Sequence, residues 1–228
     1  MSFMRNTLTK LQNKPPKPEA IIFDWDNTLV NTWPVIHHAL VETFIRMGAE
    51  PWSLEETKRK VGKSLRDHFP ALFGDKWEEA GKIYTETYRA NNLKTLEGLP
   101  EALDMLDYIG GLDLYRAVIS NKQGPVLRTE AEHMGWAKYF HKIIGAHDAK
   151  RDKPFPDPVF LALEGSGIEP SEKVWFVGDT ITDVETALVT GCTPIFYGDG
   201  KLPEDVADKV YYIDSHGHLR SLINEHHS

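Results

Sequence analysis

Cysteine is almost absent from this sequence: the only one among 228 residues is Cys192. A single cysteine cannot form an intramolecular disulfide bond, and it excludes a zinc site built from several thiolates. Its neighbours, Gly191 and Thr193-Pro194-Ile195, are typical of the beginning of a buried strand. We therefore expect Cys192 to be a core residue and not a nucleophile.

Long apolar runs and an excess of positive charge are absent as well. No segment approaches the length that spans a bilayer, and residues 1–18 lack the continuous apolar core of a secretory signal. The formal net charge of −8 provides no overall cationic surface of the kind that binds nucleic acid. These absences predict a cytoplasmic protein that binds neither membranes nor nucleic acids.

The remaining composition is that of an ordinary globular protein, with 41% hydrophobic and 26% charged residues. A chain of this length suits one large domain, or a core domain that carries a smaller insertion. Residues 14–18 consist only of lysines and prolines. We therefore interpret residues 1–18 as a flexible N-terminal arm in front of the fold.

Short apolar segments alternate with amphipathic ones through most of the chain. Each apolar segment resembles a strand that is buried on both faces of a parallel sheet. Between these segments, apolar residues three and four positions apart predict helices. The alternation predicts an α/β domain with right-handed crossovers. The predicted strands are residues 20–23, 115–120, 142–146, 173–177, 194–197 and 210–213.

One region breaks the alternation. Residues 31–97 contain no convincing strand but three helical segments, the second of which opens with a capping box at Ser53-Leu54-Glu55-Glu56. The other two lie at residues 32–48 and 76–92. We interpret residues 31–97 as a helical cap inserted after the first strand, and residues 19–30 and 98–228 as the core.

Two carboxylates, Asp24 and Asp26, follow the first predicted strand. Residues two apart on a strand point to the same face, so these side chains project together. Because like charges repel, the pair needs a cation between them or a proton on one of them. Either arrangement suits an enzyme, as a metal-held nucleophile or as a general acid. A solvated acidic turn is the alternative interpretation of this segment alone.

Three further predicted strands end in candidate functional residues, and in open parallel sheets ligands bind at the carboxyl ends of strands. The hydroxyl of Ser120 and the amide of Asn121 can hold a phosphate oxygen. Lys153, in a proline-rich segment, can neutralise a transferring phosphoryl group. Asp179 and Asp183 offer the hard oxygen ligands that Mg²⁺ prefers.

Taken together and in this order, the four segments resemble the haloacid dehalogenase-like superfamily, most closely its phosphoglycolate phosphatase-like enzymes with a helical cap. The resemblance covers roughly residues 21–197. It implies an α/β fold, in which a Rossmann-like parallel-sheet core carries a small all-helical cap domain. It also implies Mg²⁺ as the cofactor.

The resemblance implies roles for individual residues as well. Asp24 matches the nucleophile and Asp26 the general acid/base, and Lys153 matches the catalytic lysine of the third motif. Thr28 matches a residue that steadies the first loop. The residues implied for phosphate binding are Thr28, Ser120 and Asn121, and those implied for the metal site are Asp24, Asp26, Asp179 and Asp183.

Two positions depart from the family's usual residues. Asn27 replaces a glycine, and asparagine is among the best non-glycine residues at positive φ, so we expect little effect. Asn31-Thr32 replaces an Asp-Ser pair, which changes how the cap hinge is tied.

The predicted function is Mg²⁺-dependent hydrolysis of a small phosphate monoester, phosphoglycolate-like or a sugar phosphate, through an aspartyl-phosphate. A β-phosphoglucomutase-like phosphotransferase, a nucleotidase and a non-catalytic binding module are the alternatives. The expected partner is a small phosphorylated metabolite, and the expected assembly is a monomer or a homodimer. Lys63 and Arg66, within a basic cluster of the cap, are candidate specificity residues, unless this cluster is only a solvated helix face.

Overall fold

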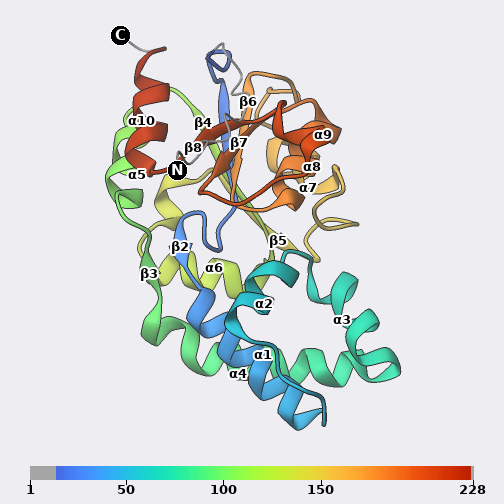
Figure 1. Cartoon of the computed structure of the whole chain (residues 1–228). Helices are drawn as coiled ribbons and strands as arrows, with labels where there is room; N and C mark the ends of the chain where they lie inside the picture. Colours follow the sequence, from blue (N-terminus) through green and yellow to red (C-terminus); the bar gives the residue numbers. More distant parts are fainter. Residues whose placement is uncertain (1–13, 227–228) are drawn as a thin grey trace, which may run out of the picture.

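The structure of the chain, a computed structural model, describes residues 14–226. Within this range, six parallel strands form one sheet in the order β5-β4-β1-β6-β7-β8 (Figure 1). All six predicted strands are present, and the predicted α/β parallel-sheet core is confirmed. The strands are β1 (Ala20–Phe23), β4 (Tyr115–Gln123), β5 (Lys142–Ala146), β6 (Val174–Gly178), β7 (Thr193–Tyr197) and β8 (Tyr211–Ile213).

Strand β1 shows why helices cover both faces of the sheet. All four of its residues are fully buried. Ile21 and Phe23 pack in a cluster with helices α5 (Ala102–Gly110), α6 (Gly124–His133) and α10 (His216–Asn224). Ala20 and Ile22 pack in a second cluster, with α7 (Asp157–Leu163) and α8 (Ile181–Thr190). A strand that is apolar at every position is stable only between two such layers.

Four α-helices lie between the short strands β2 (Val30–Asn31) and β3 (Glu97–Gly98) in the sequence, and below the sheet in Figure 1. Three of them, α1, α3 and α4, share a hydrophobic cluster of their own, to which the core adds Val126 of α6. The predicted capping box at Ser53 is present. One helix, α3, lies outside the three predicted segments. The four helices are α1 (Trp33–Arg46), α2 (Leu54–Lys60), α3 (Leu65–Phe73) and α4 (Trp77–Thr95).

Two short antiparallel strands, β2 (Val30–Asn31) and β3 (Glu97–Gly98), connect this helical block to the core. They coincide with the ends of the predicted cap, residues 31–97. We therefore call the helices α1 to α4 the cap. The remaining short elements are helix α9 (Glu204–Ala207) and the 3₁₀ helices η1 (Gly74–Lys76) and η2 (Ala137–Tyr139).

The described part of the predicted N-terminal arm, residues 14–18, contains no helix or strand but lies against the core. The indole of Trp175 donates a hydrogen bond of 2.9 Å to the carbonyl of Pro16, and Pro15 and Pro18 are buried. The remainder of the arm, residues 1–13, lies outside the described residues. The fold therefore begins earlier than the composition predicts.

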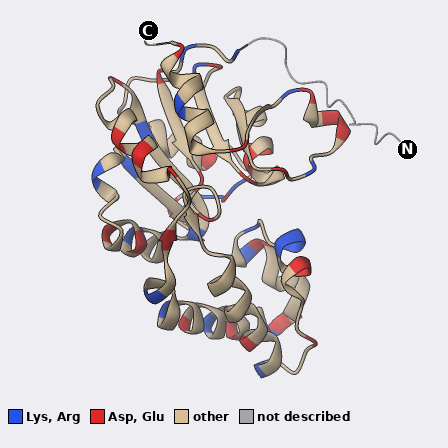
Figure 2. Cartoon of the chain, turned by 60° about the vertical axis from the view of Figure 1, so that its left-hand side comes forward, with Lys and Arg blue, Asp and Glu red and all other residues tan. Residues whose placement is uncertain are grey.

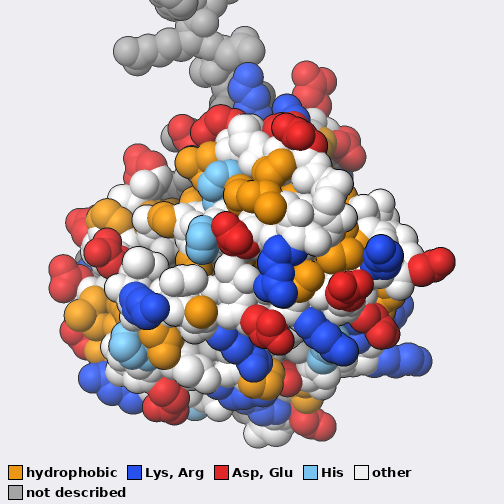
Figure 3. Space-filling model, turned by 90° about the horizontal axis from the view of Figure 1, so that it is seen from below, with side chains coloured by type: hydrophobic (Ala, Val, Ile, Leu, Met, Phe, Trp, Pro, Cys, Tyr) orange, Lys and Arg blue, Asp and Glu red, His pale blue; other side chains and the backbone are white. Residues whose placement is uncertain are grey.

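Charged side chains of both signs are scattered over the core and cap helices (Figure 2). The face formed by the cap likewise mixes lysines and arginines with acidic residues (Figure 3). Among residues 14–226, no helix is long and apolar enough to cross a membrane.

Close packing between β5 and α6 makes Gly145 a critical position. A Cβ atom there would lie 2.4 Å from the Cα of Gly124 and 2.7 Å from the carbonyl oxygen of Lys122. Because backbone atoms cannot yield locally, we expect Gly145→Ala to lower the free energy of unfolding by about 1–3 kcal/mol or more. Urea denaturation of the variant and the parent measures this loss.

Gly81 provides the matched control, since it lies inside α4 and a Cβ there would meet no atom within 4 Å. Gly81→Ala is expected to raise stability by about 0.5–1 kcal/mol, because alanine is the better helix former. Equal effects of the two substitutions would contradict the packing argument.

Candidate active site

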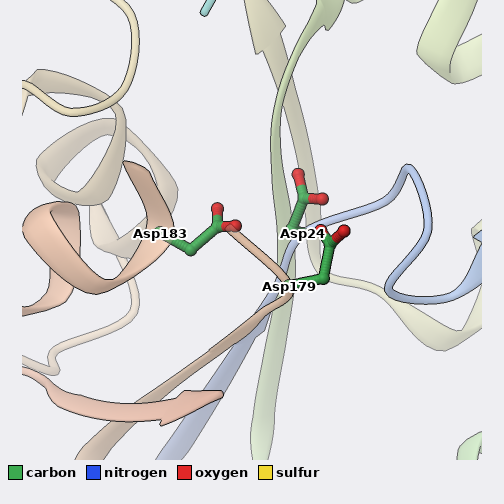
Figure 4. A group of neighbouring side chains, drawn as sticks. All are labelled: Asp24, Asp179 and Asp183. Carbon is green, nitrogen blue, oxygen red and sulfur yellow. The ribbon is translucent and has the colours of Figure 1, made fainter. Parts of the chain in front are cut away.

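Two aspartates leave the sheet at neighbouring strand ends. Asp24 directly follows β1, and Asp179 directly follows β6, the strand paired with it. Asp183 lies in the first turn of α8. Oxygen atoms of the three side chains lie within 4.8 Å of one another, and Figure 4 shows the carboxylates converging. The structure thus brings together three of the predicted metal-site residues.

The ammonium group of Lys153 links two of these carboxylates. Its Nζ atom lies 2.6 Å from Oδ1 of Asp24 and 2.6 Å from Oδ1 of Asp183, and only 3% of the residue is exposed. Burial disfavours the charged lysine, but the attraction of Asp183 and Asp24 outweighs it, so the pKa of Lys153 is raised. Lys153 is therefore a fixed positive charge beside the predicted nucleophile.

Asn121 holds the backbone of Lys153 in place. Its Oδ1 accepts a hydrogen bond of 3.0 Å from the Lys153 backbone N–H, and its Nδ2 donates one of 3.1 Å to the Lys153 carbonyl. Nδ2 also donates to the carbonyl of Gly62, at 3.0 Å, in the loop between α2 and α3. Because both N–H groups of the amide are engaged, the arrangement favours a positioning role, and the phosphate contact of Asn121 stays a prediction.

Asp183 is similarly engaged on both oxygens. Oδ1 faces Lys153, and Oδ2 accepts hydrogen bonds from the backbone N–H and the hydroxyl of Thr180, at 3.0 and 2.6 Å. These contacts form a capping box at the start of α8. The geometry therefore suits Asp183 to holding Lys153 more than to direct metal binding, which stays a prediction.

The buried carboxylates carry more negative charge than Lys153 can offset. Burial raises the pKa of Asp24; Lys153 opposes this, Asp183 and Asp26 add to it, and the pKa reaches about 7. Burial, followed by the charges of Asp24 and Asp183, also raises the pKa of Asp179 well above its usual range. A divalent cation bound by oxygen ligands would relieve this excess charge, so the donor set fits Mg²⁺.

The loop after Asp24 is shaped by Asn27, which has a φ of 60°, as expected for the residue that replaces glycine. Its side-chain oxygen accepts a hydrogen bond of 3.1 Å from the backbone N–H of Thr32, the residue that precedes α1. This contact ties the loop to the start of the cap. The hydroxyl of Thr28 donates a hydrogen bond of 3.3 Å to Oδ1 of Asp179, and its roles in steadying the loop and in phosphate binding stay predictions.

Asp26, the predicted acid/base, lies against a lysine that the sequence interpretation did not assign. Nζ of Lys122 is 2.5 Å from Oδ1 of Asp26, and the hydroxyl of Ser120 is 3.5 Å from Oδ2. The same Nζ lies 2.5 Å from Oε2 of Glu130 in α6. Asp26 is therefore held by two residues from the end of β4.

Glu130 is fully buried and collects hydrogen bonds from several elements. Besides Lys122, it accepts from Nε1 of Trp25 at 2.9 Å, from the hydroxyl of Tyr88 at 2.9 Å and from Nδ2 of Asn92 at 2.7 Å. Tyr88 and Asn92 belong to α4, so Glu130 joins the cap to the loop of the aspartates. We call this set the Glu130 cluster.

The sequence does contain a signal for Glu130. It lies three residues after Leu127 and four after Val126, on the buried side of α6. An acid at such a position needs buried donors. Lys122, for its part, directly follows the assigned pair Ser120 and Asn121.

Comparison with known proteins places this geometry in a family. The family described as "Haloacid dehalogenase-like hydrolase" matches residues 21–196. This chain belongs to that family. The match covers most of the chain and includes each of the carboxylates, lysines and strand ends described above, so the predicted resemblance is confirmed.

Individual relatives agree with this assignment. The phosphoglycolate phosphatase of Escherichia coli (strain K12) is 30% identical, over 80% of this chain and 82% of its own. The phosphoglycolate phosphatase of Aquifex aeolicus (strain VF5) is 28% identical, over 91% of this chain and 97% of its own. Among solved structures, a HAD-superfamily hydrolase from Ehrlichia chaffeensis is 30% identical, with a TM-score of 0.65 over 93% of this chain and 98% of that one.

In this haloacid dehalogenase-like hydrolase, a cavity of about 120 Å³ lies between the strand ends and the cap. Its core side includes the predicted nucleophile, the acid/base and Lys153. Helices of the cap, together with α6, form the opposite wall. The core residues that line it are Asp24, Asp26, Asn27, Ser120, Asn121, Lys122, Gln123, Val126, Lys153, Asp179 and Thr180.

The two predicted specificity residues have different positions. Lys63 lines the cavity, although the residue is exposed. Arg66 does not: its guanidinium forms two hydrogen bonds, of 2.7 and 2.6 Å, with the buried carboxylate of Asp152. A bidentate pair of this kind occupies the guanidinium, so the geometry does not favour Arg66 as a substrate contact.

The raised pKa of Asp24 makes the stability of the metal-free protein depend on pH. In the folded state the pKa of Asp24 is about 7, whereas in the unfolded state it is near 3.8, so folding favours the protonated acid. The stability that the proton provides is therefore complete below about pH 4 and is lost as pH rises to about 7. Asparagine does not titrate, so the stability of Asp24→Asn relative to the parent should increase across this interval and then level off.

Thermal unfolding of both proteins in EDTA, from pH 4 to pH 8, measures this difference. The variant also lacks the charge that helps to raise the pKa of Asp179, so the difference reports the coupled titration of the two carboxylates. A stability difference that stayed constant with pH would show that this coupled pair does not titrate between pH 4 and pH 8.

The Glu130 cluster should contribute strongly to stability. Glu130→Gln replaces an acceptor of four donors by an amide and leaves Lys122 without one of its two carboxylates. Breaking a buried pair costs about 3–5 kcal/mol, so a loss of this order is expected on urea denaturation. Glu132→Gln, on the exposed side of the same helix, is the control and should change stability by less than about 0.5 kcal/mol.

Proposed function

We propose that this chain is a Mg²⁺-dependent phosphatase that hydrolyses a small phosphate monoester through an aspartyl-phosphate on Asp24. The observation that carries the proposal is the position of Asp24, a buried carboxylate at a strand end with Lys153 at 2.6 Å and Asp179 beside it. Asp26 lies two residues further along and lines the same cavity. These are the groups that nucleophilic phosphoryl transfer requires.

The oxygen donors present fit Mg²⁺, which takes few protein carboxylates and retains waters and substrate oxygens. Asp24, Asp179 and the backbone carbonyl of Asp26 would hold the ion, with Asp183 as an acidic companion. When bound, Mg²⁺ supplies positive charge that stabilises the phosphoryl oxygens.

In the first half of the proposed reaction, a carboxylate oxygen of Asp24 attacks phosphorus and the bond to the leaving oxygen breaks. Asp26 gives its proton to that oxygen, so an alcohol leaves. In the second half, Asp26 takes a proton from water, whose oxygen attacks phosphorus. The bond to Asp24 then breaks and inorganic phosphate is released.

Lys153 supports both halves of this reaction. It already neutralises part of the charge of Asp24, and its short contact leaves it beside the phosphoryl group that forms there. Ser120 donates to Oδ2 of Asp26 and Lys122 to Oδ1, and together they hold that carboxyl at the cavity.

The names of the relatives point to phosphoglycolate as the first substrate to test, and a sugar phosphate is the other candidate class. A β-phosphoglucomutase-like phosphotransferase would share the first half of the reaction. Transfer of phosphate from Asp24 to a sugar hydroxyl, in place of release to water, distinguishes it. A nucleotidase would differ only in its substrate.

The test is phosphate release from a panel of phosphomonoesters with Mg²⁺ and with EDTA. We expect release to require Mg²⁺ and Asp24→Asn to abolish it. Asp26→Asn should reduce kcat by about 10²–10⁴-fold for esters with poor leaving groups, since it removes the proton donor.

Asp113→Asn, a substitution at an exposed aspartate after α5, is the control and should retain parental activity. Release that continued in Asp24→Asn would refute the covalent mechanism. No release from any ester would instead support the non-catalytic alternative.

A further inference from the structure

The cap side of the cavity is formed mainly by apolar and aromatic side chains. Contributions come from α1, α3, α4 and α6, so the wall is a joint product of the cap and the core. The principal residues are Ile36, Leu40, Leu65, Phe69, Tyr84 and Val126. A leaving group attached to a phosphate held at Asp24 would lie against this wall.

Aromatic rings make part of the wall continuous. Phe69 and Tyr84 pack edge to face, with centroids 5.7 Å apart, and Tyr84 stacks with Tyr88 at 5.9 Å. Phe69 and Tyr88 are buried, and the hydroxyl of Tyr88 is bound to Glu130. Tyr88 therefore presents its ring, and not a free hydroxyl, to the cavity.

The positive charges that the sequence gathers in this region are mostly engaged elsewhere. Lys60 pairs with Glu56 at 3.2 Å, and Arg66 pairs with Asp152 at 2.6 Å. Lys63 lines the cavity but is exposed to solvent, which weakens its attraction for an anion.

The imidazole of His68 does not provide a stable positive charge either. Burial, followed by the charge of Lys63, lowers its pKa, so the neutral ring is favoured. The buried ammonium of Lys122 also lines the cavity, but it is already paired with Asp26 and Glu130, at 2.5 Å each. A carboxylate on the leaving group would thus be desolvated without an unpaired buried cation on the described cap wall.

Two of the neutral polar side chains that line the cavity are already paired. Nε2 of Gln123 donates to the hydroxyl of Thr85, at 3.3 Å. The amide of Asn121 is bound to Lys153 and Gly62. Because the wall is mainly apolar, a sugar with several hydroxyl groups would leave some of them without partners, at a cost for each buried group.

We propose that the leaving group of the substrate is an uncharged alcohol with an apolar chain or ring. This inference rests on the proposed function, in which the alcohol departs with the proton of Asp26 and phosphate remains on Asp24. The apolar wall then stabilises the alcohol portion by removing it from water.

A series of alkyl phosphates tests the inference, because their leaving groups have similar acidity but differ in apolar area. We expect kcat/KM to rise about fourfold per added methylene from methyl to butyl phosphate. Isobutyl phosphate has an isopropyl group in place of the carboxylate of phosphoglycolate, and its kcat/KM should exceed that of phosphoglycolate by at least about tenfold.

Leu65→Gln and Leu72→Gln provide a matched pair of variants. Both leucines belong to α3 and pack, partly buried, against the same cap cluster, but only Leu65 lines the cavity. Leu65→Gln should lower kcat/KM for butyl phosphate by about tenfold and change that for methyl phosphate little. In Leu72→Gln, kcat/KM should rise with the length of the alkyl chain as steeply as it does in the parent enzyme.

The outcomes separate this inference from the proposed function. A rise of kcat/KM with alkyl chain length in the parent enzyme supports the inference on the leaving group, even if neither variant folds. A preference for phosphoglycolate or glucose 6-phosphate over the butyl esters would overturn it and leave the phosphatase proposal intact. If no ester released phosphate, both this inference and the proposed phosphatase function would be overturned.

Discussion

The charge balance between Lys153 and the carboxylates at the strand ends is the constraint on which the rest of the site depends. Asp24 and Asp183 both lie 2.6 Å from its ammonium, in an interior where uncompensated charges are costly. Asn121 holds the backbone of Lys153 in this position through two hydrogen bonds. Since the same amide also holds Gly62, the electrostatics of the core and the position of a cap loop depend on one side chain.

Much of the core could be predicted from the sequence because its strands carry an unambiguous pattern. In β1 and β6 nearly every residue is apolar and buried, and the residues that follow, Asp24 and Asp179, are polar. The boundary of a buried strand is therefore also the start of the site. Helix α3 was not predicted, because it is short, includes Pro70 and has one fully buried residue, Phe69.

The predictions for the site were limited by distance along the chain. A motif such as Asp24 and Asp26 depends on neighbours, but the partner of Arg66 is Asp152, 86 positions away across the boundary between cap and core. Local charge patterning gave no sign of this pairing. The Glu130 cluster was missed for the same reason, since its donors come from elements that meet only in the folded protein.

The cap is attached to the core on two sides, and the two attachments differ in their exposure to solvent. The side of α2 and α3 is held by the Asn121–Gly62 hydrogen bond and by the Arg66–Asp152 pair, whose arginine is 27% exposed. The side of α4 is held by the fully buried Glu130. Because solvent and salt reach the Arg66–Asp152 pair more readily than the buried Glu130, high ionic strength would weaken the attachment of α2 and α3 before that of α4.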